Sequence, residues 1–487
     1  MGYKTGVDKK EQLLFPASLD EYVAEDNICR LIWAFTKQLD MAVLGFKYAH
    51  CKDTGCRPYD PRMMLNLYIY GYLHRVRSSR RLEEEAKRNI EVMWLMDGLK
   101  PDDRTISGFR KDNGKALKEA FRSFSTVCNK YGLYGGVMTA TDSMKIRANN
   151  SLSNSHNATT VGNALTKIDK KIGEYLEMLE QGDLEEEGLE RCGREKIKAA
   201  LEELKERKEK YKGLKERLES ESEVSTVDPD ARLMRTGGEG RRLDSNYNVH
   251  TVVDSKYHLI VDFEVTNCAC DAGNLKEMSD KAKEILEVES LVNLADSGYY
   301  DSADIAACEE SGVTCLVAKG ADGGPKKEEG YNRKDFVYDR EKDVYKCPCQ
   351  QELSYKGNRR QHISGRKYLV YSNIEACRGC ANREKCTSAK LGYREYLRLS
   401  CQDVLDRVDE RTRKNKALYR KRQEIVEHVF GTIKSVWGYR QYLCRTKPKV
   451  TAETALSFMA YNIRRVYNVL SEERRRMGAG MRLLSES

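Results

Sequence analysis

The sequence predicts a mixed α/β core that follows an all-helical region and is interrupted by two insertions. Apolar residues recur at helical spacing through about the first 125 residues, and short β-branched runs then alternate with helical ones. Two stretches within this α/β part differ in composition, one dense in Glu, Lys and Arg and the other in Cys. We expect a helical N-terminal DNA-binding domain over 1–125, a core over 135–330 and 394–470, a helical hairpin over 163–223 and a Cys-rich insertion over 331–393.

The N-terminal region begins with a helix-capping signal. Ser18 is followed three residues later by Glu21, which is the spacing of a capping box. Further helices are predicted over 77–99 and 102–124, each with polar residues at its start and basic residues on one side. Two short helices around a turn that contains Gly and Pro suit a helix-turn-helix DNA reader, with an ordinary helical bundle as the alternative.

The core is predicted from an alternation of strand and helix patterns. A strand is expected over 135–148 and two paired strands over 245–267, with their turn near Asp254. Helix, strand, helix and strand then follow between residues 271 and 320. This order favours a mixed sheet.

The first insertion reads as an antiparallel helical hairpin. Its two runs keep a narrow apolar stripe at helical spacing and are separated by three glycines, Gly182, Gly188 and Gly193. Because the other faces are charged, we expect a projecting arm with no catalytic role. After the Cys-rich insertion, one long helical stretch is predicted from about Gln402 through Lys434.

Composition excludes some classes of protein. No window approaches the roughly 18 consecutive apolar residues of a membrane helix, and the N-terminus lacks the apolar segment of a signal peptide. We therefore expect neither a membrane protein nor a secreted one. The net charge of +9 is small for 487 residues, but the segment Arg411–Lys449 holds twelve Lys or Arg residues and two acids. That segment favours an anionic partner, with a solvated basic helix as the alternative.

Three acidic residues lie at positions in the predicted core where their carboxylates could bind a divalent metal ion. Asp142 lies on the first strand of the core, Asp296 ends the strand LVNLA, and Glu427 lies on the basic helix. A carboxylate at the end of an apolar strand is costly to bury alone, and such carboxylates readily converge on a divalent ion. Each acid taken alone would more often be an ordinary surface residue.

Cationic residues surround the last of these acids in the sequence. Lys434 follows Glu427 by seven residues, which on an α-helix places both side chains on one face. An acid and a base on one helical face suit the joint binding of a metal and a phosphate. The candidate DNA-binding residues are Lys434, Arg420, Lys421, Arg422 and Arg440.

Five of the sixteen cysteines lie within forty residues. Without an export signal these thiols should be reduced, and four thiolates in a tetrahedral array suit structural zinc. The expected ligands are Cys347, Cys377, Cys380 and Cys386, with Cys349 in reserve. Zinc would then fold an insertion that is too polar to bury a core of its own, and free buried thiols are the alternative.

These motifs resemble the DDE transposases of bacterial insertion sequences, in the group numbered 1182. The resemblance covers nearly the whole chain and includes DPDARLM, YNVHTVVDSKYHLIVDFEVTN, LADSGYY, YKCPCQQEL and IVEHVFGTIK. It implies an RNase H-like core in which Asp142, Asp296 and Glu427 form the catalytic triad. It also implies that Lys434 contacts DNA at the transposon end.

The activity that the resemblance implies is Mg²⁺-dependent DNA strand cleavage followed by strand transfer. Two Mg²⁺ ions, for which Mn²⁺ can substitute, would be held by the three carboxylates. The expected partners are the inverted repeats of the element and the target DNA, bound by a homodimer or a higher oligomer in the bacterial cytoplasm, at the nucleoid. The alternatives are a domesticated DNA-binding protein that no longer cuts and an RNase H-fold nuclease.

Overall fold

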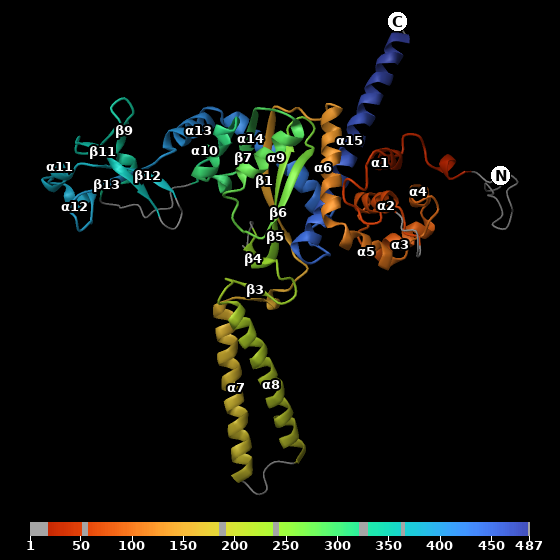
Figure 1. Ribbon diagram of the computed structural model, residues 1–487, viewed down its shortest axis with the longest axis horizontal. Coiled ribbons are helices and arrows are strands. Elements are labelled where there is room, and N and C mark those ends of the chain that lie inside the picture. Colours follow the sequence, from red (N-terminus) through yellow and green to blue (C-terminus); the bar gives the residue numbers. More distant parts are fainter. Residues whose placement is uncertain are drawn as a thin grey trace, which may run out of the picture.

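The computed structural model describes residues 18–50, 57–184, 191–236, 243–320, 330–361 and 366–485, with side chains left out of the description for 181–194 and 473–485. Its parts are set out in Figure 1, where a central sheet lies between an N-terminal group of helices and a second, smaller sheet. As the sequence predicts, the fold is mixed α/β with a helical N-terminal region. None of the described helices has the length and apolar character needed to cross a bilayer.

The N-terminal helices are shorter than the sequence predicts. The Ser18–Glu21 capping box is present, but it caps a single 3₁₀ turn. The two long helices expected over 77–99 and 102–124 are each broken at an asparagine, Asn89 and Asn113. The side chain of Asn89 accepts hydrogen bonds from the next helix, so it ends one helix and starts another. The elements are η1 (Leu19–Tyr22), α1 (Ile28–Lys37), α2 (Pro61–Leu73), α3 (Ser79–Arg88), α4 (Ile90–Leu95), α5 (Asp103–Asp112) and α6 (Gly114–Lys130).

The central sheet is mixed, in the order β4-β5-β1-β7-β8, with β6 also paired to β5. Strand β5 is antiparallel to β1, β4 and β6, whereas β1, β7 and β8 run parallel to one another. Three antiparallel strands followed by two parallel strands are consistent with an RNase H-like core. The strands are β1 (Met138–Arg147), β4 (Arg232–Arg235), β5 (Leu243–Asp254), β6 (Ile260–Thr266), β7 (Leu291–Ala295) and β8 (Val313–Val317).

Helices cover both faces of this sheet. Neighbouring side chains on β1 point to opposite faces of the sheet. On one face, Thr141 donates a hydrogen bond to Asn293, which in turn donates to Ser279 of α9 (Leu275–Leu286). On the other face, Asp142 accepts a hydrogen bond from Arg422 of α14 (Lys416–Phe430). Helix α10 (Ser302–Glu310) packs beside β8.

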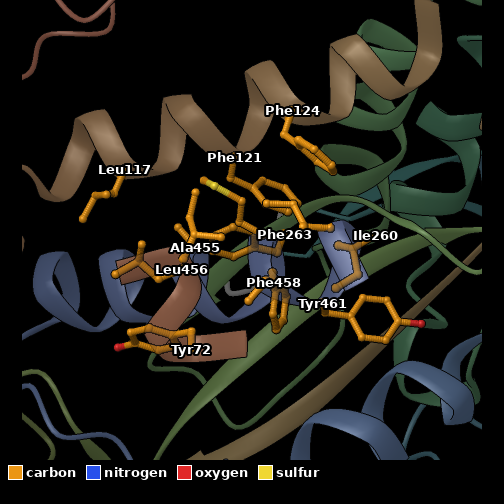
Figure 2. Packing of buried hydrophobic residues seen from close by; sticks show 14 of the residues in the cluster. Tyr72, Leu117, Phe121, Phe124, Ile260, Phe263, Ala455, Leu456, Phe458 and Tyr461 are labelled. Carbon is orange, nitrogen blue, oxygen red and sulfur yellow. The ribbon is translucent and has the colours of Figure 1, made fainter. Parts of the chain in front are cut away.

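The N-terminal helices and the sheet share one continuous core. Phe121 of α6, Phe263 of β6 and Phe458 of α15 (Lys447–Ser485) meet there, and Figure 2 shows their rings together. The ring centroids of Phe121 and Phe263 are 5.2 Å apart, and those of Phe263 and Phe458 are 5.0 Å apart. Apolar contacts therefore hold the helical region against the central sheet.

The predicted hairpin is present as α7 (Ala158–Leu184) and α8 (Arg191–Arg217), which project from the core (Figure 1). A two-stranded ladder of β2 (Ser155–His156) and β3 (Val224–Ser225) closes its base. A small apolar cluster of Val161, Leu214 and Val224 anchors the arm.

The Cys-rich insertion differs from the prediction because it has a core of its own. Five strands form an antiparallel sheet in the order β13-β12-β11-β10-β9. Phe336, Tyr345, Leu353, Tyr371 and Tyr396 are buried against one another. Tyrosine explains the difference, because its ring buries apolar area while its hydroxyl finds a polar partner. The elements are η4 (Arg333–Asp335), β9 (Val337–Asp339), β10 (Val344–Lys346), β11 (Glu352–Arg360), β12 (Lys367–Ser372), α11 (Ile374–Arg378), α12 (Arg383–Cys386) and β13 (Glu395–Leu399).

The long helix predicted through Lys434 is also interrupted. Helix α13 (Gln402–Lys414) ends at Asn415, α14 follows, and residues Gly431–Val436 form a π-helical turn, η5. The remaining short turns are η2 (Leu152–Asn154) and η3 (Ser297–Tyr299). A π turn contains more residues than an α turn, so the seven residues from Glu427 to Lys434 no longer span two regular α-helical turns.

Candidate active site

Strand register brings Asp142 and Asp296 to the same place. Strands β1 and β7 are parallel, with Thr141 opposite Ala295. Asp142 and Asp296 each follow that pair by one residue, so they lie side by side where β7 ends. The acid in the middle of a long strand and the acid at the end of a short one thus become neighbours.

Arg422 of α14 bridges the two carboxylates. Its Nη1 lies 2.7 Å from Asp142 Oδ2, and its Nη2 lies 3.2 Å from Asp296 Oδ1. The arginine side chain is 12% exposed, against 24% for Asp142 and 46% for Asp296. The guanidinium therefore neutralises a partly buried acid pair, where two bare carboxylates would repel each other.

Burial dominates the electrostatics of Asp142. It raises the pKa of that carboxyl to about 6, while a hydrogen bond from the Ser143 amide and the charge of Arg422 oppose the shift. The charges of Asp296 and Asp271 add to the rise. The carboxylate of Asp271 also lies against Gly298, two residues after Asp296. Asp271 was missed in the sequence because no strand pattern leads to it.

Tyr419 fixes the position of α14 against the sheet. Its hydroxyl donates to the carbonyl of Ala295 at 3.2 Å, and its ring lies 5.9 Å from the Arg422 guanidinium carbon. Tyr419 precedes Arg422 by three residues, so both lie on one face of the helix. That i, i+3 pair was the signal in the sequence that could have identified Tyr419.

Glu427 lies on the same helix, five residues after Arg422, and is exposed. In the part of the chain that the structure describes, its side chain makes no ion pair or hydrogen bond. Helix α14 itself contacts β1 and β7, the two strands that lead to the aspartates. Glu427 is thus presented to solvent from the helix that holds the acid pair.

The predicted cations separate into different groups. Lys434 lies with Arg440 and with Lys145 of β1, and burial together with these two charges lowers the pKa of Lys434. Arg440 also donates through Nε to the Lys434 carbonyl at 3.3 Å. Arg420 and Lys421 are exposed on α14, and only Arg420 lines a cavity there. Lys145 was missed because its partners are remote in sequence.

The five thiols of the insertion line one small apolar pocket, Cys349 included. Cys349 Sγ and Cys380 Sγ are 3.8 Å apart, and the amide of Gln351 donates to Cys347 Sγ. A hydrogen bond from the Asn382 side chain lowers the pKa of Cys349, whereas burial raises that of Cys386. The cysteine held in reserve is therefore in direct contact with one of the four expected ligands.

The two clusters carry the kinds of donor group that suit the metals suggested by the sequence. Paired carboxylates suit Mg²⁺, and clustered thiols suit zinc. Among the described residues, however, no three His, Cys, Asp or Glu side chains are arranged to hold an ion. At the acid pair, the Arg422 guanidinium occupies the position between the two carboxylates where an ion would bind.

Two family models match the chain. One, described as a transposase domain (DUF772), matches residues 17–112, and the other, described as a transposase DDE domain, matches residues 346–467. Comparison with curated proteins and with solved structures finds no match. The DDE match includes Glu427 and Lys434, whereas Asp142 and Asp296 lie between the two matches.

The matches support a transposase function, for which DNA is the partner. Neither model specifies a group of insertion sequences, so group 1182 stays a prediction. Two transposase models near the two ends of the chain, with a mixed α/β core between them, indicate an insertion-sequence DDE transposase.

Proposed function

We propose that the protein is an active transposase that binds the terminal inverted repeats of its element, hydrolyses DNA strands at the ends and joins the freed 3′-hydroxyls to target DNA. One observation carries this proposal. Asp142 and Asp296 lie side by side, and both contact an arginine from the helix that also carries Glu427.

Asp142, Asp296 and Glu427 are the residues proposed to hold two Mg²⁺ ions, or Mn²⁺ in their place. When bound, Mg²⁺ lowers the pKa of a water or hydroxyl and offsets charge on phosphate oxygens. The chain contributes positioning, because the β1–β7 register aligns two of the carboxylates before any ion binds. Arg422 offsets their charge in the ion-free protein.

Cations around the acid pair are proposed to hold the DNA backbone. Lys434, Arg440 and Lys145 are close enough for their charges to interact, and Arg420 and Lys421 are exposed on α14. Such contacts to phosphate oxygens set affinity and register without reading sequence. The N-terminal helices are proposed to read the inverted repeats. We further propose that the protein acts on DNA as a homodimer or a higher oligomer, in the bacterial cytoplasm at the nucleoid.

A structural zinc ion in the insertion is a separate part of the proposal. Zinc–thiolate bonds of about 2.3 Å in a tetrahedron separate neighbouring sulfurs by about 3.8 Å. The Cys349–Cys380 separation of 3.8 Å agrees with that spacing. Metal analysis of protein purified without chelators tests it: we expect about one zinc per chain, and a ratio near zero would exclude the ion.

The main experiment is strand cleavage. Labelled duplexes that carry the inverted repeats flanking the gene are incubated with the protein in Mg²⁺ or EDTA, beside the variant Asp142→Asn. We expect nicking at the repeat ends that requires Mg²⁺ and is lost in the variant. Tight binding without cutting would instead indicate a domesticated DNA-binding protein. Cutting without the pairing of two end fragments would indicate an RNase H-fold nuclease.

A further inference from the structure

A cavity of about 590 Å³ lies between the end of β8 and helices α13 and α14. Val317 and Ala318 line it from the sheet side, and the other lining residues come mostly from the last two turns of α13 and the first two turns of α14. Arg422 lines it as well, and the same guanidinium contacts Asp142 and Asp296. The cavity therefore adjoins the proposed site of cleavage.

The charge of this cavity is strongly positive. Five cations line it, namely Lys319, Arg413, Lys416, Arg420 and Arg422. Asp409 is the one carboxylate among its lining residues, and burial raises its pKa although the Tyr300 hydroxyl donates to it at 2.9 Å. Within the described chain, Arg413, Lys416 and Arg420 make no ion pair. These three cations, which have no ion-pair partner in the described chain, attract an anion.

A buried hydroxyl gives a second, independent sign of a ligand. Thr412 lines the cavity and is only 7% exposed, yet its Oγ1 has no hydrogen-bond partner in the described chain. A helical threonine commonly bonds a carbonyl one turn earlier, and an unsatisfied buried hydroxyl is costly. Nε of Arg422 is likewise buried without a partner. An oxyanion in the cavity could accept from such donors.

We propose that this cavity binds a backbone phosphate of the DNA strand that runs through the active site, next to the phosphate that is cut. The inference rests on the proposed function and adds Thr412, Arg413, Lys416 and Lys319 to the DNA-binding surface. Thr412 and Arg422 would bind the phosphate oxygens directly, while the exposed cations supply attraction.

Salt dependence of DNA binding tests this inference. Anisotropy of a labelled duplex is measured in EDTA, between about 50 and 200 mM salt, where each phosphate contact contributes about 0.9 to the slope of log K against log salt. For Arg413→Gln with Lys416→Gln, we expect the slope to fall by about 1, because the cavity is proposed to bind one phosphate. For Thr412→Val, which keeps the size of the side chain, we expect affinity to fall by about five-fold, the worth of one hydrogen bond.

Lys414→Gln is the matched control. Lys414 is on the same helix but pairs with Glu410 at 2.8 Å and does not line the cavity, so slope and affinity should be unchanged. An unchanged slope in the double variant, or wild-type affinity in Thr412→Val, would overturn the proposal. Cleavage is measured in a separate assay. If the wild-type protein binds the DNA ends of the element without cutting them, the proposed function is wrong. The salt dependence of binding would still show whether the cavity binds a phosphate.

Discussion

The central sheet and the Cys-rich insertion each gather side chains of the kinds that bind metals, but they do so by different means. In the sheet, two parallel strands align Asp142 with Asp296, and a largely buried arginine, 12% exposed, offsets their charge. In the insertion, five thiols from turns and short helices line an apolar pocket beside an aromatic core. The acid pair depends on charge compensation, whereas the insertion has packing to stabilise it without an ion.

The largest expected effect is on cleavage at the acid pair. Asp142→Asn, Asp296→Asn and Glu427→Gln should each lower the cleavage rate by on the order of a thousandfold, about 4 kcal/mol of transition-state stabilisation. Gel assays of labelled element ends give the rates. Asp280→Asn on α9, whose carboxylate pairs with Lys276, is the control that should cut normally. Full activity in any one of the three variants would remove that residue from the triad.

The second-largest effect is expected on the stability of the Cys-rich insertion, when an aromatic ring is removed from its core. Tyr345 is 4% exposed and lies among three other aromatic rings, so Tyr345→Ala should cost about 3–5 kcal/mol of local stability. Hydrogen exchange of amides in β10 to β12 measures it. Tyr355→Ala, at a 45% exposed position on the same sheet, should cost far less. Equal protection in the two variants would mean that the aromatic core does not stabilise the insertion.

A smaller loss of stability is expected when Arg422, the cation between the two acids, is replaced. Arg422→Gln should destabilise the ion-free protein by about 1–2 kcal/mol, less than a fully buried pair because Asp296 is half exposed. Added Mg²⁺ should then raise the melting temperature more in the variant than in the wild type. Arg420→Gln, two residues away and not in contact with the acids, is the control. Identical Mg²⁺ responses would show that Arg422 does not compensate the pair.

The smallest effect concerns a single hydroxyl in the insertion. Tyr371 is buried and its hydroxyl donates to Asp343 at 2.6 Å. Tyr371→Phe keeps the ring and should cost only about 1 kcal/mol in the free energy of unfolding. Urea denaturation followed at the insertion measures this cost. A loss as large as that of Tyr345→Ala would show that polar contacts, and not ring packing, dominate this sheet.

Local patterns predicted most of the elements, and the errors have local causes. The core strands and the hairpin follow from periodicity, which requires only neighbouring residues. The breaks at Asn89, Asn113 and Asn415 were missed because asparagine favours helix ends, but a single one does not interrupt the apolar periodicity on either side of it. The π turn after Phe430 was also missed, because a wider turn has no signature in the spacing of apolar residues. The aromatic core of the insertion depends on which tyrosines meet across strands.

Periodicity and residue chemistry are local properties, and they sufficed to predict the mixed α/β class of fold and to single out three candidate acids and a cluster of cysteines. Three further features depend on folding: Arg422 bridges Asp142 and Asp296, Cys349 contacts Cys380, and Thr412 lines a basic cavity. These contacts join residues up to 280 positions apart. Such contacts depend on strand register and helix packing, which spacing along one chain cannot specify.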